Sequence, residues 1–361
     1  MPLPARRPEP DLTILLVNYN GWSDVERLVG SLSRAPEVAQ GRCEIVVVDN
    51  ASEEPAPIGW DRPEPSPGVR LIARANNGGF AVGINTGWRA ARARWLLLLN
   101  PDVVAGPEFL GAVLERIERL EARPRTESTP PVGVVGFGLR NADGTRQPSV
   151  GVFPSLARAA REVLIPRDRR KYQADWRVRP GPVPWVTGAC MLVRADLLKQ
   201  LGGMDEDFFL YHEEVSLCRS AWDRGWSVEY DPAVEVVHLR PLQTRAISPK
   251  LRVITRHSKL LYFRKHLPPW QFQTLARIVS CEAALRGAWS RRRGRRAEAG
   301  AWRAVGRLAR DLRRGREIRG TAVLALAEWA VDGPPVTRLD PSVEAGLPST
   351  ARGVEGMTPA G

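Results

Sequence analysis

Four stretches in the first third of the chain are rich in apolar residues, most of them in unbroken runs, and each runs into polar residues. They are residues 12–20, 44–52, 69–80 and 93–106. An unbroken apolar run of this length is typical of a strand covered on both faces, as in a parallel sheet packed between helices. Residues 22–35 and 81–94 are apolar at helical spacing, and Ser23 is a candidate N-cap. The alternation of strands and helices predicts a parallel, doubly wound α/β sheet with right-handed crossovers.

The pattern continues after residue 130 and changes near residue 245. We predict a strand with an Asp-Gly turn, then a strand and a helix, then a loop, a helix and a strand, over residues 132–149, 186–203 and 205–238. Arginine-rich amphipathic helices follow, over residues 249–266, 270–291, 297–317 and 321–331. The chain is therefore expected to have a lead, an α/β domain, a basic helical region and a disordered tail, at residues 1–11, 12–245, 246–332 and 333–361.

Polar residues end three of the predicted strands. They are Asn18, Asp49 and the sequence Asn100-Pro101-Asp102. The carboxyl ends of parallel strands share one edge of a sheet, and open α/β sheets place their ligands there. An ordinary Asn-Pro turn explains one such end, but the repetition favours a binding cleft.

The segment NNGGFAVGINTG, residues 76–87, has four glycines between a strand and a helix. Glycines in this position let backbone amides approach a phosphate near a helix N-terminus. No Gly-Lys-Ser/Thr follows, so this is not a Walker loop, and it does not fit GxGxxG after the first strand. The alternative is a glycine-assisted turn with tight helix packing.

The composition is that of an ordinary soluble protein, with 43% hydrophobic and 26% charged residues. The formal net charge is +13, and arginines cluster at residues 167–171 and 290–296, which would attract phosphates. The four cysteines form no CxxC pair, which indicates a reducing compartment without structural zinc. The N-terminus has no apolar signal core, and the apolar stretch 321–331 is too short to span a bilayer. We expect a cytoplasmic protein, either free in the cytosol or held at the cytoplasmic face of the membrane.

Six segments, in their order and spacing, resemble glycosyltransferase family 2, and its bacterial rhamnosyltransferase-like members most. They are LTILLVNYNG, EIVVVDNAS, NNGGFAVGINTG, WLLLLNPDV, VTGACMLVRADLLKQLGGMDEDFFLYHEE and VVH. The resemblance covers about residues 12–266 and implies a GT-A fold over 12–245, whose doubly wound, Rossmann-like sheet is mixed but mostly parallel, followed by the C-terminal helical region. It also implies a nucleotide-diphosphate sugar donor, a divalent metal and inversion at the anomeric carbon.

Carried over by position, the resemblance assigns residues to the donor and the acceptor. The donor residues are Asn18, Asn20, Asp49, Asn77, Gly79, Asn85 and Asn100. Gly188 and Ala189 open the acceptor side. Trp185, just before them, can stack on a sugar, with core packing as the alternative.

Asp102 stands where the family's metal-binding DxD motif lies, and His238 matches a histidine that completes the metal site in some relatives. Mg²⁺ or Mn²⁺ commonly takes only one or two protein carboxylates and completes its shell with phosphates and water. An imidazole ligand suits Mn²⁺ better than Mg²⁺. The alternative for His238 is a hydrogen-bonded histidine at a strand end.

Glu213 and Glu214 occupy the family's usual Glu-Asp pair, so Glu214 is the candidate catalytic base with Glu213 as its helper. Acids in a first helical turn also favour the helix dipole without any function. The chain departs from the family here, because Ser216 replaces a usual Asp and Arg219 is displaced by one position. The acceptor is therefore less defined than the fold.

The basic helices have two interpretations. Phe272, Leu275, Ile278, Val279, Leu285 and Trp289 form one apolar stripe, and Trp302, Val305, Leu308 and Leu312 form another. Such helices can lie in a membrane interface against anionic lipids. They can equally pack as a helical subdomain with a solvated arginine face.

The sequence therefore predicts an inverting glycosyltransferase with a lipid-linked or polysaccharide acceptor in cell-envelope glycan synthesis. By resemblance alone the donor is dTDP-L-rhamnose, with a UDP-sugar as the runner-up. The rival is a non-catalytic sugar-nucleotide or glycan-binding relative. Nucleic-acid binding is disfavoured, because no helix-turn-helix, RRM or zinc module is recognisable. The oligomeric state stays open.

Overall fold

The computed structural model describes residues 9–124, 129–161, 179–241 and 246–332. The chain divides into two compact units, Met1–Asp205 with Glu213–Arg245, and Glu206–His212 with Ala246–Gly361. The predicted disordered tail 333–361, the basic cluster 167–171 and most of the N-terminal lead lie outside the described residues. We keep the predicted boundary between residues 245 and 246 as a proposal.

The first unit contains twelve strands among its described residues. They are β1 (Leu12–Asn18), β2 (Cys43–Asp49), β3 (Val69–Ala73), β4 (Trp95–Leu99), β5 (Val103–Val104), β6 (Val132–Arg140), β7 (Arg146–Gln147), β8 (Val150–Gly151), β9 (Gly181–Pro182), β10 (Trp185–Val186), β11 (Cys190–Arg194) and β12 (Ser227–His238). Ten form one sheet in the order β3-β2-β1-β4-β11-β6-β12-β5, with β7 beside β6 and β9 beside β12. Strands β8 and β10 form a separate pair.

The predicted mixed, mostly parallel sheet is confirmed. Strands β3, β2, β1 and β4 are parallel neighbours, and β12 is parallel to β6. Strand β11 is antiparallel to both β4 and β6, so it alone reverses direction among the longer strands. The short strands β5, β7 and β9 are also antiparallel to their partners.

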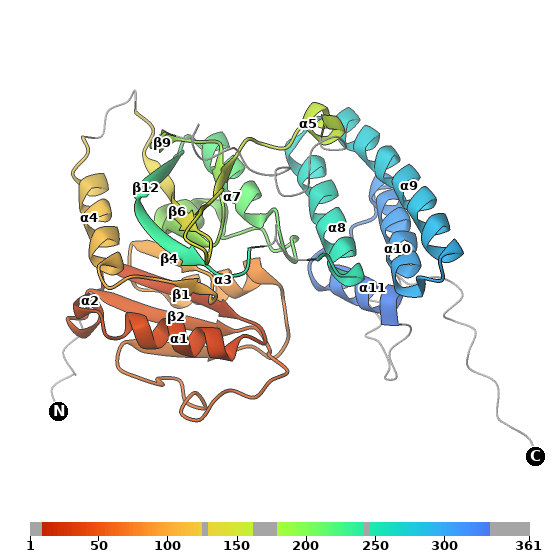
Figure 1. Ribbon diagram of the computed structural model, residues 1–361. Helices are drawn as coiled ribbons and strands as arrows, with labels where there is room; N and C mark the ends of the chain where they lie inside the picture. Colours follow the sequence, from red (N-terminus) through yellow and green to blue (C-terminus); the bar gives the residue numbers. More distant parts are fainter. Residues whose placement is uncertain (1–8, 125–128, 162–178, 242–245, 333–361) are drawn as a thin grey trace, which may run out of the picture. The chain divides into compact units, whose positions relative to one another are not determined.

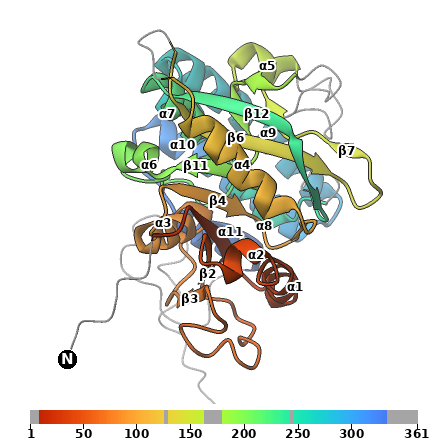
Figure 2. The ribbon, with the colours of Figure 1, turned by 90° about the vertical axis from the view of Figure 1, so that its left-hand side faces the viewer.

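Helices cover both faces of this sheet, which explains the unbroken apolar runs. The described helices of this unit are α1 (Trp22–Leu32), α2 (Pro36–Ala39), α3 (Phe80–Ala90), α4 (Phe109–Glu121), α5 (Leu156–Arg161), α6 (Ala195–Leu201) and α7 (Glu213–Asp223). In β1, Ile14 and Leu16 join the core formed with α1 and α4, and Figure 2 shows α4 lying across the sheet. On the opposite face, a Cβ at Gly83 of α3 would lie 2.7 Å from Val17. Glycine therefore allows the close approach of α3 to β1.

Two local expectations need correction. Ser23 is not the N-cap of α1: the cap is Gly21, which makes no side-chain cap bond. Instead, Asn18 Oδ1 accepts from the Gly21 amide at 3.0 Å. The sequence analysis also omitted α4, although its apolar residues recur at helical spacing. They are Phe109, Leu110, Val113, Leu114, Ile117 and Leu120.

The second unit contains the four predicted basic helices, coloured teal to blue in Figure 1. They are α8 (Pro249–His266), α9 (Pro269–Arg292), α10 (Arg296–Arg313) and α11 (Thr321–Asp332). The apolar stripe of α10 is buried, from Trp302 to Leu312. The stripe of α9 divides, because Phe272, Leu275 and Val279 are buried whereas Ile278, Leu285 and Trp289 are exposed. Among the described residues, no helix is both long enough and apolar enough to cross a membrane.

Candidate functional site

Asn18 and Asp49 end the neighbouring strands β1 and β2 at the same level, because they are paired in parallel register. Asn18 Nδ2 donates to Asp49 Oδ1 at 2.9 Å, and the Ser52 hydroxyl donates to the same oxygen at 2.6 Å. The Ser52 amide donates to Asp49 Oδ2 at 3.2 Å. Asp49 is 9% exposed. The three bonds therefore compensate its burial and fix the carboxylate at the sheet edge.

Asn20 joins the loop after β1 to the loop after β2. Its φ of 53° is left-handed, a conformation that asparagine tolerates better than most residues. Its Oδ1 accepts from the Glu53 amide at 2.7 Å, and its own amide donates to Ser52 Oγ at 2.8 Å. Asn20 is exposed, and the Ser52 hydroxyl links it to Asn18 and Asp49.

Asn50, which the sequence analysis did not single out, organises the glycine-rich loop. Its Nδ2 donates to Asn77 Oδ1 at 2.8 Å and to the Gly79 carbonyl at 3.0 Å. Its Oδ1 accepts from Arg74 Nε at 3.1 Å and from the Gly78 amide at 3.2 Å. The importance of Asn50 could have been predicted from the sequence, because it directly follows a buried strand. It connects the end of that strand to the start of α3.

Asn77 and Gly79 lie at the beginning of α3, as predicted. Asn77 Oδ1 accepts from the Gly79 amide at 3.0 Å. Gly79 is the N-cap of α3 with φ of 90°, a conformation that residues with a Cβ rarely adopt. The loop is thus preorganised at a helix N-terminus, where backbone amides favour anions.

Both polar ends of the Asn85 side chain are bonded to the backbone of Met204. The residue is 1% exposed, its Nδ2 donates to the Met204 carbonyl, and its Oδ1 accepts from the Met204 amide, both at 2.8 Å. A Cβ at Gly203 would lie 2.6 Å from Asn85 Oδ1. These contacts make Asn85 a clamp between α3 and the turn after α6, so we no longer count it among the donor residues.

Asp102 and His238 meet because β5 pairs with the end of β12, where His238 lies opposite Val103. His238 Nε2 lies 3.3 Å from Asp102 Oδ1. The Leu239 amide donates to the Asp102 carbonyl at 3.0 Å. Both side chains are about nine-tenths buried. The two predicted metal ligands are therefore neighbours in the structure.

Gln147 contacts Nδ1 of His238, the ring nitrogen that does not face Asp102. Gln147 Nε2 lies 2.9 Å from His238 Nδ1, while Gln147 Oε1 is buried without a hydrogen-bond partner in the described part of the chain. If the Gln147 amide is rotated, its Oε1 accepts a hydrogen bond from a protonated Nδ1 of His238. The Nε2 atom of His238, beside Asp102, then carries the lone pair that a metal ion requires. A polar atom orphaned in this way fits a metal-ligating state of His238.

The described residues contain no group of three or more His, Cys, Asp and Glu side chains suited to a metal. Asp102 and His238 therefore supply two ligands at most, the sparse arrangement that leaves positions for phosphates and water. Arg240 adds a cation here: its Nε lies 3.7 Å from Asp102 Oδ2, and its guanidinium also pairs with Asp24.

Glu213 and Glu214 form the first turn of α7, where the helix dipole favours negative charge. Both are 5% exposed. Tyr211 and His212, immediately before them, have φ of 67° and 71°. Two successive left-handed residues without glycine are strained, and such strain persists where the surroundings impose it.

A series of contacts joins these residues into one region. The Asn100 amide donates to the Ala189 carbonyl at 3.0 Å, which ties the end of β4 to the start of β11. A Cβ at Gly188 would lie 3.7 Å from Glu214 Cβ and 3.9 Å from the ring of Phe80, the first residue of α3. The glycine-rich loop, the Gly188 turn, the candidate base and the end of β4 are thus neighbours.

Trp185 requires correction. Its ring is 1% exposed, and its Nε1 donates to the Val152 carbonyl at 2.9 Å. A ring enclosed in this way has no face for a sugar, so the core-packing alternative applies. Gly188 lies beside Glu214, and the acceptor role of Gly188 and Ala189 stays a prediction.

The cysteine nearest to the candidate base is not a nucleophile. Burial is the main cause that raises the pKa of Cys218 to about 12; a backbone hydrogen bond at Val186 opposes the rise, and the charge of Glu214 makes a smaller contribution to it. Cys218 therefore stays a thiol at neutral pH. Acid–base chemistry in this region falls to carboxylates.

The chain matches the family model "Glycosyltransferase like family 2" over residues 10–256. It is 31% identical over 246 residues to the N-acetylglucosaminyl-diphospho-decaprenol L-rhamnosyltransferase of Mycobacterium tuberculosis, covering 63% of this chain and 75% of that protein. It is 25% identical to the low-salt glycan biosynthesis hexosyltransferase Agl10 of Haloferax volcanii, covering 75% and 82%. The rhamnosyltransferase WbbL of Escherichia coli K12 is 26% identical over 48% of this chain and 62% of WbbL.

Among solved structures, the mannosyltransferase PcManGT of Pyrobaculum calidifontis, in complex with GDP-Man and Mn²⁺, has a TM-score of 0.47. It is 17% identical, over 91% of this chain and 88% of that chain.

Proposed function

This chain belongs to glycosyltransferase family 2, and on that premise we propose that it is an inverting, metal-dependent glycosyltransferase. It moves a sugar from a nucleotide diphosphate to a hydroxyl group of a lipid-linked or polysaccharide acceptor in cell-envelope glycan synthesis. The observation that carries this proposal is the pairing of Asp102 with His238 at 3.3 Å, beside the ends of the parallel strands.

The donor binds along the carboxyl ends of β1, β2 and β4. Asn18 and Asp49 face the nucleoside, and the preorganised loop at Asn77 and Gly79 faces the phosphates. The hydrogen bonds between Asn18, Asp49 and Ser52 support this role, because they hold the Asp49 carboxylate in one orientation. Asn20 and Asn100 complete the donor residues from the loops after β1 and β4.

Mn²⁺ or Mg²⁺ is held by Asp102 and His238, the pair whose chemistry fits a cation that takes its other ligands from phosphate and water. When bound, the ion supplies positive charge to the leaving diphosphate. Gln147 orients His238 through Nδ1. Arg240 lies beside Asp102 and adds positive charge next to the leaving group.

Glu214 accepts the proton of the attacking hydroxyl as the sugar is transferred. A base on the side of the sugar opposite the leaving group gives inversion, with an acceptor hydroxyl where inverting glycosidases use water. The position of Glu214 beside Gly188 supports this role, because Gly188 leaves space that a side chain would fill. Glu213 acts as helper, and Gly188 and Ala189 form the acceptor side.

We propose dTDP-L-rhamnose as the donor and a lipid-linked glycan as the acceptor, with a UDP-sugar as the alternative donor. Two relatives that are named rhamnosyltransferases support the sugar. The mycobacterial relative is named as an enzyme of a diphospho-decaprenol substrate, which supports the lipid-linked acceptor.

A peripheral membrane contact through α9 accompanies this acceptor. Trp270, Ile278, Leu285 and Trp289 are 46–74% exposed and fall within an arc of about 100° on the helix. Arg292, which is exposed, lies in the same arc. An apolar face with tryptophans at its ends and arginine beside it is typical of helices in the interface of anionic membranes.

The deciding experiment incubates the purified protein with a panel of nucleotide sugars and Mn²⁺, and measures thermal protection and slow hydrolysis of the donor. Protection by dTDP-L-rhamnose alone is expected, with loss of hydrolysis in Asp102→Ala. Protection by a UDP-sugar would establish the alternative donor. Binding without hydrolysis or transfer to any acceptor would instead identify a non-catalytic relative, and no binding would refute the proposal.

A further inference from the structure

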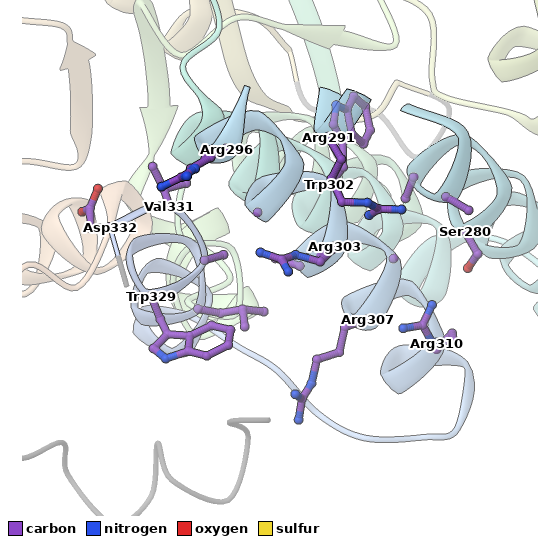
Figure 3. A pocket seen from close by; sticks show the side chains of 17 residues that line it. Ser280, Arg291, Arg296, Trp302, Arg303, Arg307, Arg310, Trp329, Val331 and Asp332 are labelled. Carbon is purple, nitrogen blue, oxygen red and sulfur yellow. The ribbon is translucent and has the colours of Figure 1, made fainter. Parts of the chain in front are cut away.

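The second unit encloses a pocket of about 710 Å³ between α9, α10 and α11 (Figure 3). This volume is in the range of pockets that bind small molecules. All of its lining residues belong to the second unit, so it is separate from the candidate site described above.

One wall of the pocket is cationic. Arg296, Arg303, Arg307 and Arg310 line it from α10, and their spacing of seven, four and three residues places them on one face of the helix. Arg291 joins them from α9. Figure 3 shows Arg303, Arg307 and Arg310 following one another along α10.

Most of this charge has no ion-pair partner among the described residues. Arg307 lies 3.4 Å from Asp311, and Asp332, an acid of the lining, is paired with Lys250. The other four arginines, at positions 291, 296, 303 and 310, make no ion pair with the residues that the structure describes. These four arginines are exposed, as in a solvated arginine face, but solvation alone does not explain why they gather around one pocket.

The remainder of the lining is apolar. Ala283 and Ala304 are buried small residues from α9 and α10, and Leu326 and Trp329 come from α11. The helices approach closely, since a Cβ at Gly300 would collide with the carbonyl oxygen of Ala330. The pocket therefore combines a cationic wall with an apolar one.

We propose that this pocket binds the phosphate or diphosphate head of an anionic amphiphile with an apolar chain, of the kind that carries a lipid-linked acceptor. Arg303 and Arg310 grip the head, because the planar guanidinium forms paired hydrogen bonds with phosphate oxygens. The chain lies against Leu326 and Trp329. The biological occupant rests on the proposed function, but the binding of such an amphiphile does not.

The test measures binding of farnesyl diphosphate, below its micelle concentration, to the full-length protein by calorimetry. Farnesyl diphosphate should bind at least about tenfold more tightly than inorganic diphosphate or farnesol, since each of these lacks one half of the ligand. Equal binding of inorganic diphosphate would mean a site for free phosphates and would overturn the proposal, as would the absence of any binding.

The double variant R303A/R310A should weaken binding at least about tenfold. The matched control R277A/R314A removes the same charge from two exposed arginines outside the pocket and should bind like wild type. Ala284→Trp, which fills the pocket from an exposed position on α9, should also weaken binding. Equal losses in R277A/R314A would indicate general charge attraction and refute the pocket.

Donor binding distinguishes a failure of the pocket proposal from a failure of the proposed function. R303A/R310A should bind the nucleotide sugar like wild type, and Asp102→Ala should bind farnesyl diphosphate like wild type. Failure of farnesyl diphosphate alone overturns the pocket, whereas failure of every nucleotide sugar alone overturns the enzyme assignment.

Discussion

The Nε2 atom of His238 lies 3.3 Å from Oδ1 of Asp102, although one residue ends the sheet's longest strand and the other follows the leucine-rich strand β4. The antiparallel pairing of β5 with β12 produces this contact. Both side chains are buried at a sheet edge that also holds Asn18 and Asp49. We propose this pair as the protein's two ligands to a divalent cation.

Asp102→Asn and His238→Gln should each lower Mn²⁺-stimulated donor turnover by about 100-fold or more, because each removes one of only two protein ligands. Gln147→Leu should weaken Mn²⁺ binding by about 10- to 100-fold, since it removes the group that orients His238. Mn²⁺ titration of donor hydrolysis measures all three. A wild-type Mn²⁺ response in Asp102→Asn would contradict the assignment.

Glu214→Gln should lower kcat by about 10² to 10⁴-fold while leaving the KM of the donor nearly unchanged, because a general base acts in the transition state and not in donor binding. Glu213→Gln is the matched control on the same helical turn and should lose much less. Steady-state kinetics with a saturating acceptor would separate them. The reverse order of losses would make Glu213 the base.

Gly83→Ala should destabilise the protein by about 1–3 kcal/mol, because the new methyl would meet Val17 where α3 packs on β1. Gly30→Ala in α1 is the control: nothing lies within 4 Å of its Cβ, so alanine should stabilise the helix by up to about 1 kcal/mol. Urea denaturation measures both changes. Equal effects at the two positions would show that α3 does not pack this closely.

His257 should make the stability of the second unit depend on pH. Burial lowers the pKa of His257 to about 4, against a partly opposing hydrogen bond to the Ile318 carbonyl. Above about pH 6.5 the imidazole is neutral in both states, so it causes no pH dependence. Between pH 6.5 and 4 only the unfolded chain takes up the proton. The free energy of unfolding therefore falls as the pH is lowered, by about 3 kcal/mol in total by pH 4.

Denaturant unfolding at pH 7.5, 6.5, 5.5 and 4.5, followed in wild type and in His257→Gln, checks this prediction. The glutamine keeps a donor for the Ile318 carbonyl but does not titrate, so the loss specific to His257 should disappear. Parallel pH curves for the two proteins would show that His257 titrates normally.

Much of the fold was predictable from local pattern. The unbroken apolar runs that become β1, β2 and β4 can be buried only between two helical layers, and α8 begins and ends where the periodicity predicts. Helix α4 was equally visible from its apolar spacing and was simply omitted. Gly202, with φ of 79°, ends α6 as its place in the sequence predicts.

The candidate site was predictable only in part. Asn18, Asp49 and Asp102 follow apolar runs, so their place at one sheet edge follows from strand direction. Asn85 and Trp185 carry the same kind of polar or aromatic signal, yet both are buried in packing contacts. Residue type and spacing do not distinguish a side chain that faces a ligand from one that faces the core.

Sequence periodicity was enough to specify the strands, the helices and the edge where polar residues collect, because these depend on neighbours along the chain. Three features depended on folding instead: the contact of His238 with Asp102, the four hydrogen bonds of Asn50, and the exposure of half the apolar stripe of α9. The first two join segments that are separated in the chain, and strand pairing selects which of their side chains meet. The third depends on how much of α9 the other helices cover.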